Sequence, residues 1–401
     1  MRAKLLLGIF VLCCSYVFSQ FYRAFLAVLT PVLGVEMGMN ATDFAYASGA
    51  WFAAFGVFQF PVGMLLDSIG PRRTAGYIFT IFAGGGAFVF ALAPNTEMII
   101  VAMALIGIGC SVALMAPMYI FVREYDAARF ATLISLFVGI GTLGNIASSE
   151  PLAAAVELYG WRQCAFALGW GTLAVGFAIL FFVRDPEKLE RQDGQGGYAE
   201  LFRIRELWLI FPVILCGYMV GAGLRSSWIG PFHSELYGYE TLQIGRVTLY
   251  MSIALVLGTF FYGPLDRIFN SRKKVVLFGQ LATLICCLAM AFSLPEDPLW
   301  SAAAFAFIGF AGANYAVQMA HGKSFLPVHL TGRGVTLLNF CSIGGAGIFQ
   351  WLSGVFVEMQ AVPGDPRIGY EALFYFYSFF ICVACLIYAF SKDAEPNSRG
   401  F

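Results

Sequence analysis

The stretch Gly63-Met-Leu-Leu-Asp67-Ser-Ile-Gly70-Pro-Arg72-Arg73 is a short charged segment between two long apolar runs, residues 45–66 and 74–94. Each run is long enough to cross a bilayer as a helix. The Gly-Pro pair favours a reversal of the chain, and the two arginines that follow it place the reversal on the cytoplasmic side of a membrane. The stretch therefore predicts two antiparallel membrane-spanning helices joined by a tight cytoplasmic turn.

A second copy of this pattern, Gly263-Pro-Leu-Asp266-Arg267, lies in the other half of the chain and leads into the basic residues 272–274. Asp67 and Asp266 are about 200 positions apart in a chain of 401 residues, and a spacing of half the chain predicts an internal duplication. Each half is then expected to fold as a similar unit.

The pattern Gly-x-x-x-Asp-x-x-Gly-x-Arg-Arg, between the second and third predicted spans, resembles the signature loop of the major facilitator superfamily. The number of spans, the half length and the placement of the loop agree with that family over nearly the whole chain. Ser68 stands where the family frequently has arginine, and Pro71 where a basic residue is common. The second copy has only two residues between Gly263 and Asp266. The resemblance implies a secondary transporter of two six-helix bundles.

The resemblance also implies a gating role for the two charged turns. Asp67, Arg72 and Arg73, together with Asp266 and Arg267, are expected to hold the cytoplasmic ends of the two bundles together in the outward-open state. Breaking those contacts would open the cytoplasmic side.

The composition is that of a polytopic membrane protein. The residue types Ala, Val, Ile, Leu, Met, Phe, Trp, Tyr and Cys make up 59% of the chain and charged residues 12%, whereas about 25% charged residues are usual in soluble proteins. Mean hydropathy is +0.76. The net charge is zero, and no basic tract suggests nucleic-acid binding. The ten cysteines lie in or beside apolar runs and do not have the spacing of a secreted disulfide framework.

The apolar runs predict an all-α polytopic membrane protein, with twelve transmembrane helices as two pseudo-symmetric six-helix bundles. The spans are expected at residues 6–34, 45–67, 74–94, 97–121, 130–156, 163–183, 207–231, 244–265, 275–294, 299–322, 335–360 and 371–391. A cytoplasmic linker is expected at 185–206, between an N-terminal bundle, 1–184, and a C-terminal bundle, 207–401. The first apolar run continues past residue 23 and is too long for a signal peptide, so it is expected to be the first span.

The distribution of basic residues predicts the orientation. Of the 24 Lys and Arg residues, 19 lie in the N-terminus, the linker, the C-terminal tail and the turns on one side of the predicted bundles. The turns on the opposite side are mostly acidic. Both termini are therefore expected in the cytoplasm, and we expect a multi-pass protein of a bacterial inner membrane.

Two arginines lie deep within predicted spans. Arg23 falls in the first span and Arg225 in the seventh, about 200 positions apart, so the duplication relates them as well. A charge inside a span is costly unless it faces water or a partner, which makes it a candidate functional group. In the superfamily that the chain resembles, spans one and seven line the central cavity, and the organophosphate:phosphate antiporters place one arginine on each.

The arginine pair predicts a small anionic substrate, either a carboxylate or a phosphate ester, because arginine binds such groups through two parallel hydrogen bonds. Glu150, near the outer part of the fifth span, is the nearest acidic candidate. The alternative is structural, with each guanidinium bonded to backbone carbonyls or extended towards the membrane surface.

Further polar and aromatic side chains within spans are candidates for the same cavity. The predicted substrate-binding residues are Tyr22, Tyr119, Trp228, Asn314, Tyr315, Gln318 and Asn339. Asn314 and Gln318 are four residues apart, so they share a helix face. The alternative for each of these residues is a contact between helices.

Two other substrates stay open. Met115 with Met118, and Cys216 with Met219, each pair two sulfur atoms on one helix face, and soft sulfur ligands suit Cu(I). A carrier of a neutral aromatic solute or drug would instead depend on tryptophan and tyrosine side chains. A receptor or assembly protein on a transporter scaffold is a third class of function.

The chain carries no HExxH, Gly-x-Ser-x-Gly or P-loop motif. An enzyme is therefore not expected, and transport would be driven by gradients rather than by ATP. We expect no cofactor, no resident metal and no nucleic-acid partner; the expected partners are the lipid bilayer and a small-molecule substrate. We expect symport or antiport of a small organic anion by a monomer that works by alternating access.

Overall fold

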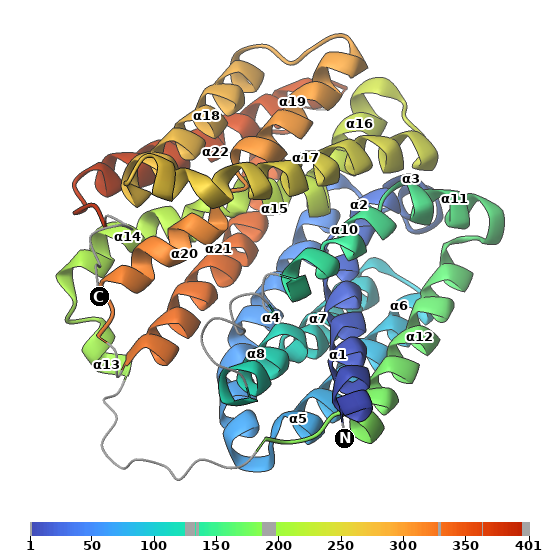
Figure 1. Cartoon of the computed structure of the whole chain (residues 1–401). Coiled ribbons are helices and arrows are strands. Elements are labelled where there is room, and N and C mark those ends of the chain that lie inside the picture. Colours follow the sequence, from blue (N-terminus) through green and yellow to red (C-terminus); the bar gives the residue numbers. More distant parts are fainter. Residues whose placement is uncertain are drawn as a thin grey trace. The chain divides into compact units, whose positions relative to one another are not determined.

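The computed structural model describes residues 2–124, 133, 136–186, 198–327, 330–362 and 364–394 (Figure 1). The named elements in these ranges are all helices. The expectation of an all-α fold is therefore confirmed.

The chain divides into two compact units. The first unit comprises Met1–Glu190 together with Tyr239–Arg246, and the second comprises Arg191–Gly238 together with Val247–Phe401. Most of the predicted linker, 185–206, lies outside the described residues, because nothing is described between 187 and 197. The predicted domain boundaries stay a prediction.

The helices are coloured along the chain in Figure 1, from blue at the N-terminus to red at the C-terminus. Up to residue 186 they are α1 (Arg2–Tyr22), α2 (Phe25–Val28), α3 (Thr30–Met37), α4 (Ala41–Ile69), α5 (Pro71–Ile78), η1 (Phe79–Gly84), α6 (Gly85–Leu92), α7 (Thr96–Cys110), α8 (Val112–Glu124), α10 (Leu143–Ala147), α11 (Glu150–Tyr159) and α12 (Trp161–Phe182). From residue 198 they are α13 (Tyr198–Leu201), α14 (Arg205–Gly217), α15 (Met219–Gly223), η2 (Leu224–Trp228), α16 (Ile229–Tyr237), α17 (Thr241–Ile268), α18 (Arg272–Phe292), α19 (Pro298–Ala311), α20 (Tyr315–Ser324), α21 (Thr331–Gln360) and α22 (Pro366–Ala389).

Ten helical segments among the described residues are long and apolar enough to cross a membrane. They are Ala41–Ile69, Pro71–Leu92, Thr96–Phe121, Trp161–Phe182, Arg205–Tyr237, Thr241–Ile268, Arg272–Phe292, Pro298–Ser324, Gly334–Gln360 and Pro366–Ala389. Two shorter apolar helices, Leu7–Tyr22 and Leu136–Ala147, lie at the first and fifth predicted spans. The start of the fifth predicted span falls outside the described residues.

The predicted reversal after Asp67 is confirmed. α4 ends at Ile69, and Gly70 adopts φ +87°, in the left-handed region that favours glycine. Pro71 opens α5 at the first helical position, where a missing N–H removes no helical hydrogen bond. A Cβ atom on Gly70 would also lie 2.7 Å from Asp185 Oδ1, so glycine is required here for space as well as for conformation.

Glycines let helices of the first unit approach one another closely. A Cβ atom on Gly107 of α7 would lie 2.3 Å from the carbonyl oxygen of Trp51 in α4. A Cβ atom on Gly109 would lie 2.1 Å from the backbone nitrogen of Ala83 in η1. The backbone of α7 is therefore in direct contact with both neighbours, and the position of Trp51 on α4 is fixed by it.

Candidate functional site

The first span is broken at Arg23, so the predicted span 6–34 is not one continuous helix. α1 ends at Tyr22 and α2 begins at Phe25, and the N–H of Ala24 donates to the carbonyl oxygen of Phe21 at 3.1 Å. Arg23 is 8% exposed. Breaks in helices at membrane depth are tolerated where protein surrounds them, and they are typical of substrate sites in transporters.

The Arg23 guanidinium lies over two aromatic rings of α4. Its Cζ atom is 5.3 Å from the centroid of the Trp51 ring and 5.0 Å from that of Phe55. The two rings are stacked, with centroids 5.1 Å apart and an interplanar angle of 21°. Contact with the ring faces stabilises a cation without introducing an opposite charge. These aromatic contacts therefore position the Arg23 guanidinium on α4.

The seventh span contains a π-helical segment that carries Arg225. This segment, η2, follows the short helix α15, and Arg225 within it is 2% exposed. π-Helical turns are rare and occur frequently at functional sites. Both arginines that the predicted duplication relates thus lie at irregularities in otherwise helical spans, Arg23 at a break and Arg225 in a π-turn.

Side chains of α21 hold η2 in place. Gln350 Nε2 donates to Ser226 Oγ at 2.5 Å, and Trp228 Nε1 donates to Ser353 Oγ at 3.1 Å. Trp228, a predicted substrate-binding residue, is fully buried in this contact. Its role in substrate binding stays a prediction, and its hydrogen bond to α21 helps to hold the η2 segment that carries Arg225.

Tyr22 contacts a different helix from Arg23. Its hydroxyl group shares a hydrogen bond of 2.9 Å with Thr172 Oγ1 in α12, and its ring packs edge to face with Phe25 at a centroid distance of 5.5 Å. Tyr22 is 1% exposed. The structure places Tyr22 in helix packing within the first unit, and a role in substrate binding stays a prediction.

The tenth span is broken at a polar cluster. α19 ends at Ala311, α20 begins at Tyr315, and Asn314 between them is fully buried. Asn314 Oδ1 accepts from Gln280 Nε2 at 3.1 Å and from Gln318 Nε2 at 2.5 Å, and Asn314 Nδ2 donates to the Ala311 carbonyl at 3.1 Å. The structure therefore brings the predicted pair Asn314 and Gln318 together and adds Gln280 of α18, which the sequence analysis missed.

Tyr315 and Asn339 are also brought together. The Tyr315 hydroxyl donates to Asn339 Oδ1 at 2.5 Å, which joins α20 to α21. The Tyr315 ring lies against Tyr218, with centroids 6.0 Å apart. Both residues of the hydrogen bond are half-buried. The structure shows a contact between helices for them, and binding of substrate by either one stays a prediction.

The predicted gating residue Asp67 lies beside Arg123 of α8. Arg123 Nη2 is 3.9 Å from Asp67 Oδ1, and the Arg123 Cζ atom lies 3.4 Å from the centroid of the Tyr119 ring. Arg123, the ion-pair partner of Asp67, therefore covers the ring of Tyr119, which was predicted to bind substrate. Half of the Asp67 side chain is exposed, so this ion pair contributes little to the stability of the unit.

The other end of the first signature loop is held by Asp185, which follows α12. The backbone N–H of Arg72 donates to Asp185 Oδ1 at 2.8 Å, and the Arg72 side chain lies 3.9 Å from the same carboxylate. A carboxylate at a helix N-terminus is favourable because it accepts from free N–H groups and complements the helix dipole. Arg73 is exposed, and nothing in the structure tests its gating role.

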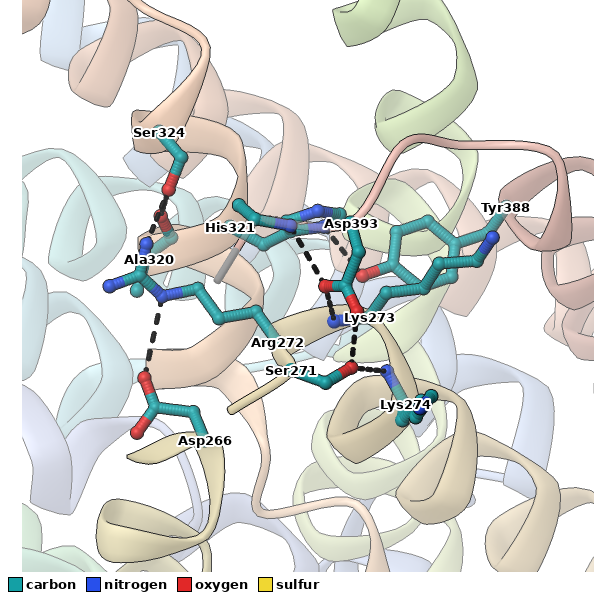
Figure 2. A network of polar contacts seen from close by, with 11 residues as sticks. Asp266, Ser271, Arg272, Lys273, Lys274, Ala320, His321, Ser324, Tyr388 and Asp393 are labelled. Carbon is teal, nitrogen blue, oxygen red and sulfur yellow. Dashed lines mark hydrogen bonds and ion pairs between the residues drawn. The ribbon is translucent and has the colours of Figure 1, made fainter. Parts of the chain in front are cut away.

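The second signature loop has an equivalent arrangement, shown in Figure 2. Arg272 Nε lies 3.4 Å from Asp266 Oδ2, and Arg272 Nη1 donates to Ser324 Oγ at the end of α20. Ser271 Oγ donates to Asp393 Oδ2, and the N–H of Lys273 donates to Asp393 Oδ1 at 3.0 Å. Asp393, which follows α22, thus holds the start of α18 as Asp185 holds the start of α5. Arg267 is exposed.

The residues after α22 are bonded to the same end of the second unit. Lys273 Nζ donates to the carbonyl oxygens of Ala389 and Ser391 at 2.6 and 2.8 Å. One ring nitrogen of His321, Nε2, lies 3.1 Å from the Lys392 carbonyl, which can only accept, so Nε2 carries the hydrogen. His321 Nδ1 then accepts from the Tyr388 hydroxyl at 2.6 Å. This arrangement fixes the neutral tautomer of His321 (Figure 2).

Asp393 has a pKa below its ordinary value. Partial burial raises the pKa, but hydrogen bonds from Ser271 Oγ and from the N–H groups of Lys273 and Ala394 to the carboxylate outweigh burial. A carboxyl group with a lowered folded-state pKa stabilises the fold above its unfolded pKa, and this stabilisation is lost as the pH falls through the folded value.

We expect Asp393→Asn to lower the melting temperature at pH 7, because one of its donors loses an acceptor. The difference from the wild type should shrink as the pH falls below about 4 and through the lowered pKa of Asp393. Thermal unfolding in detergent between about pH 7 and pH 2.5 measures it, with Glu157→Gln at an exposed carboxylate as the matched control. A difference that is constant with pH would contradict this role of the charge.

Asp185 and Asp393 were missed by the sequence analysis, although the chain contains a signal for them. Each follows a basic residue just after the last helix of its half, in Arg184-Asp185 and Lys392-Asp393. This short pattern recurs at about the same interval as the two signature loops, so a search of the duplicated halves for matching acidic residues would have found the pair.

A third cluster lies at the opposite end of the first unit. Trp161 Nε1 donates to Glu36 Oε2 at 2.5 Å, and Arg162 Nη2 donates to Glu36 Oε1 at 2.9 Å. The hydrogen bond from Trp161, together with the Arg162 guanidinium, holds the pKa of the Glu36 carboxyl below its ordinary value. Glu150, the nearest acidic candidate to the arginines, instead forms an ion pair of 3.2 Å with Arg246.

Of the two sulfur pairs considered for Cu(I), one lies within a single helix and the other is divided between two helices. Met115 and Met118 lie in α8, whereas Cys216 lies in α14 and Met219 in α15, with the helix interrupted between them at Tyr218. All ten cysteines are free. Among the residues that the structure describes, no group of three or more His, Cys, Asp or Glu side chains could hold a metal ion.

The sequence profile described as Major Facilitator Superfamily matches residues 12–348 and 242–400. The "probable sulfoacetate transporter SauU" of Cupriavidus necator is 22% identical over 309 residues, which are 71% of this chain and 71% of that protein. The "probable L-galactonate transporter" of Escherichia coli is 27% identical over 373 residues, 84% of this chain and 79% of that protein.

A hexuronate transporter of Escherichia coli is 21% identical over 294 residues, 65% of this chain and 66% of that protein. Among solved structures, a D-xylose-proton symporter superposes with a TM-score of 0.77 and 13% identity, covering 98% of this chain and 99% of that one. At this level of identity the structural likeness shows the shared fold.

Proposed function

The chain belongs to the major facilitator superfamily and is a secondary transporter, and we propose that its substrate is a small organic anion. It is a multi-pass integral membrane protein and not an enzyme. We propose further that Arg23 and Arg225 each contribute one guanidinium group to recognition of the acidic group.

The observation that carries this proposal is the placement of the two arginines. Each is buried, at 8% and 2% exposure, and each lies at an irregularity of a span that the duplication relates to the other. A buried cation is costly for a membrane protein to retain unless it serves a function. A guanidinium group matches the planar oxygen pair of a carboxylate, and it also matches the oxygens of sulfonate and phosphate groups.

The names of the relatives support the same substrate class. Sulfoacetate, L-galactonate and the hexuronates are all small acids, and the proteins named for them align with most of this chain at 21–27% identity. These compounds have different carbon skeletons, and each of them carries a carboxylate group. We therefore propose an acid-recognising site in this chain, without a choice among the skeletons.

A thermal-shift assay on the purified protein tests the proposal. We expect sulfoacetate, L-galactonate or D-galacturonate to raise the melting temperature, because a ligand of the folded state stabilises it by mass action. D-galactose, which has the same ring as D-galacturonate without the acid, is the matched control. Uptake of the stabilising acid into proteoliposomes then shows transport. Stabilisation by neutral solutes or Cu(I), with none by acids, would overturn the proposal.

We also propose that both termini and the linker face the cytoplasm of a bacterial inner membrane, and that the protein works as a monomer. The basis for the orientation is the asymmetry of Lys and Arg. In a cysteine-free background, single cysteines at Glu240 and Asp297, which are exposed, should react with an impermeant maleimide from outside. Cysteines at positions 194 and 396, which lie outside the described residues, should react only after the membrane is opened. The reverse pattern would contradict this topology.

A further inference from the structure

The surroundings of Arg23 contain a second hydrogen-bond donor. Trp51, whose ring lies 5.3 Å from the Arg23 Cζ atom, is fully buried. Its Nε1 atom has no hydrogen-bond partner among the described residues. A buried indole N–H usually finds an acceptor, and a native exception needs an explanation, such as a role in binding a ligand.

The position of Trp51 is fixed on several sides. Its carbonyl oxygen faces Gly107 of α7, where even a Cβ atom would approach to 2.3 Å. Its ring packs edge to face on Phe52, with centroids 4.9 Å apart, and is stacked on Phe55 at 5.1 Å. The indole is therefore held as part of a rigid aromatic layer rather than as a mobile side chain. A donor held in this way is pre-organised for a ligand.

Trp51 and Trp228 differ in the hydrogen bonding of their indole N–H groups. Trp228 is equally buried in the second unit, and its Nε1 donates to Ser353 Oγ at 3.1 Å. The indole N–H of Trp228 therefore has a hydrogen-bond acceptor within the protein. The Arg23 guanidinium lies over the indole ring of Trp51, with its Cζ atom 5.3 Å from the ring centroid.

We propose that Trp51 is a substrate-contacting residue of the first unit. Its indole N–H donates a hydrogen bond to one oxygen of the acidic group while the Arg23 guanidinium binds another oxygen of the same group. This inference rests on the proposed function, because it deepens the recognition of an acid at Arg23. It predicts a preference for groups with two or more acceptor oxygens, such as carboxylate and sulfonate, and gives the aromatic layer a role in specificity.

Trp51→Phe tests the proposal because it keeps an aromatic face for Arg23 and removes only the N–H donor and part of the ring. The probe is the acid that stabilises the wild type in the panel of sulfoacetate, L-galactonate and D-galacturonate. We expect its dissociation constant to rise about ten- to a hundredfold, the change for one hydrogen bond to a charged group. Trp170→Phe, at a 65% exposed tryptophan of α12, is the matched control and should bind as the wild type does.

A second measurement observes the indole N–H groups of the wild-type protein directly. In wild-type protein labelled with ¹⁵N-tryptophan, one indole N–H resonance should move on addition of the acid and stay in place on addition of D-galactose. Trp51→Phe should remove that resonance. If the acid binds but no indole resonance moves, or if Trp51→Phe binds the acid with wild-type affinity, Trp51 does not contact the substrate.

The same experiments separate failure of this inference from failure of the proposed function. If no acid of the panel stabilises the wild type, the proposed function fails and the role of Trp51 fails with it. If acids bind and Arg23→Gln weakens them, but Trp51→Phe does not, the function stands and only the role of Trp51 is overturned. A merely structural tryptophan would lower the melting temperature without changing the affinity for acid.

Discussion

Arg23→Gln and Arg225→Gln are each expected to weaken binding of the transported acid by one to two orders of magnitude. A hydrogen bond between a charged side chain and a buried anion contributes about 1.5–3 kcal/mol, and each 1.4 kcal/mol corresponds to about a tenfold change in the dissociation constant. Arg→Lys should restore binding only in part, because an ammonium group cannot form the two parallel bonds of a guanidinium. Equilibrium binding of the acid identified by thermal shift measures the effect.

Two controls make this result interpretable. Size-exclusion profiles check folding, and Arg203→Gln makes the same chemical change at an exposed arginine. If both buried-site variants bind the acid with wild-type affinity, the arginines are structural. A copper carrier would lose function on substitution of Met115 or Met219 and tolerate Arg23→Lys, whereas a carrier of neutral aromatics would depend on tryptophan and tyrosine instead.

Asp67→Asn is expected to shift the balance between the inward- and outward-open states about tenfold, with folding and binding of the acid largely retained. The charge on Asp67 faces Arg123 at 3.9 Å on a surface that contributes little to stability. A change of about 1–2 kcal/mol in the difference between two states is nevertheless enough to move their populations by this factor. Transport should therefore slow or become biased in one direction.

The populations can be measured by electron-spin distance distributions between labels at Ile69 and Phe269, two exposed residues beside the two signature loops. Ser68→Ala, in the same loop, is the matched control. Loss of acid binding in Asp67→Asn, with unchanged distance distributions, would show that Asp67 acts on the substrate site and not on gating.

Much of the fold could be predicted from the sequence because hydropathy is a local property. The ten candidate spans, the reversal at Gly70-Pro71 and the duplication around Asp67 and Asp266 all follow from short stretches read by themselves. The two buried arginines could also be found in this way, since a charge within an apolar run is visible without any knowledge of packing.

The sequence analysis found Arg23, Arg225 and Trp228, but not which side chains lie against the arginines. Trp51 and Phe55 lie under the Arg23 guanidinium, and nothing in the sequence links these two residues of the second span to Arg23. Gln350, which bonds to the π-helical segment of Arg225, is more than 120 positions away. Partners so distant along the chain leave no local pattern, because only the packing of helices decides which of many polar side chains come within hydrogen-bond distance.

The sequence by itself thus determined which segments are helical, where the chain reverses and which charges lie in spans, because burial in lipid selects for apolar composition segment by segment. Only the tertiary structure decided where those helices break. The break at Arg23, the π-turn at Arg225 and the gap at Asn314 are places where the backbone departs from a regular ladder. Such a departure is stable where side chains of neighbouring helices surround and bond to it, and those neighbours are defined only in three dimensions.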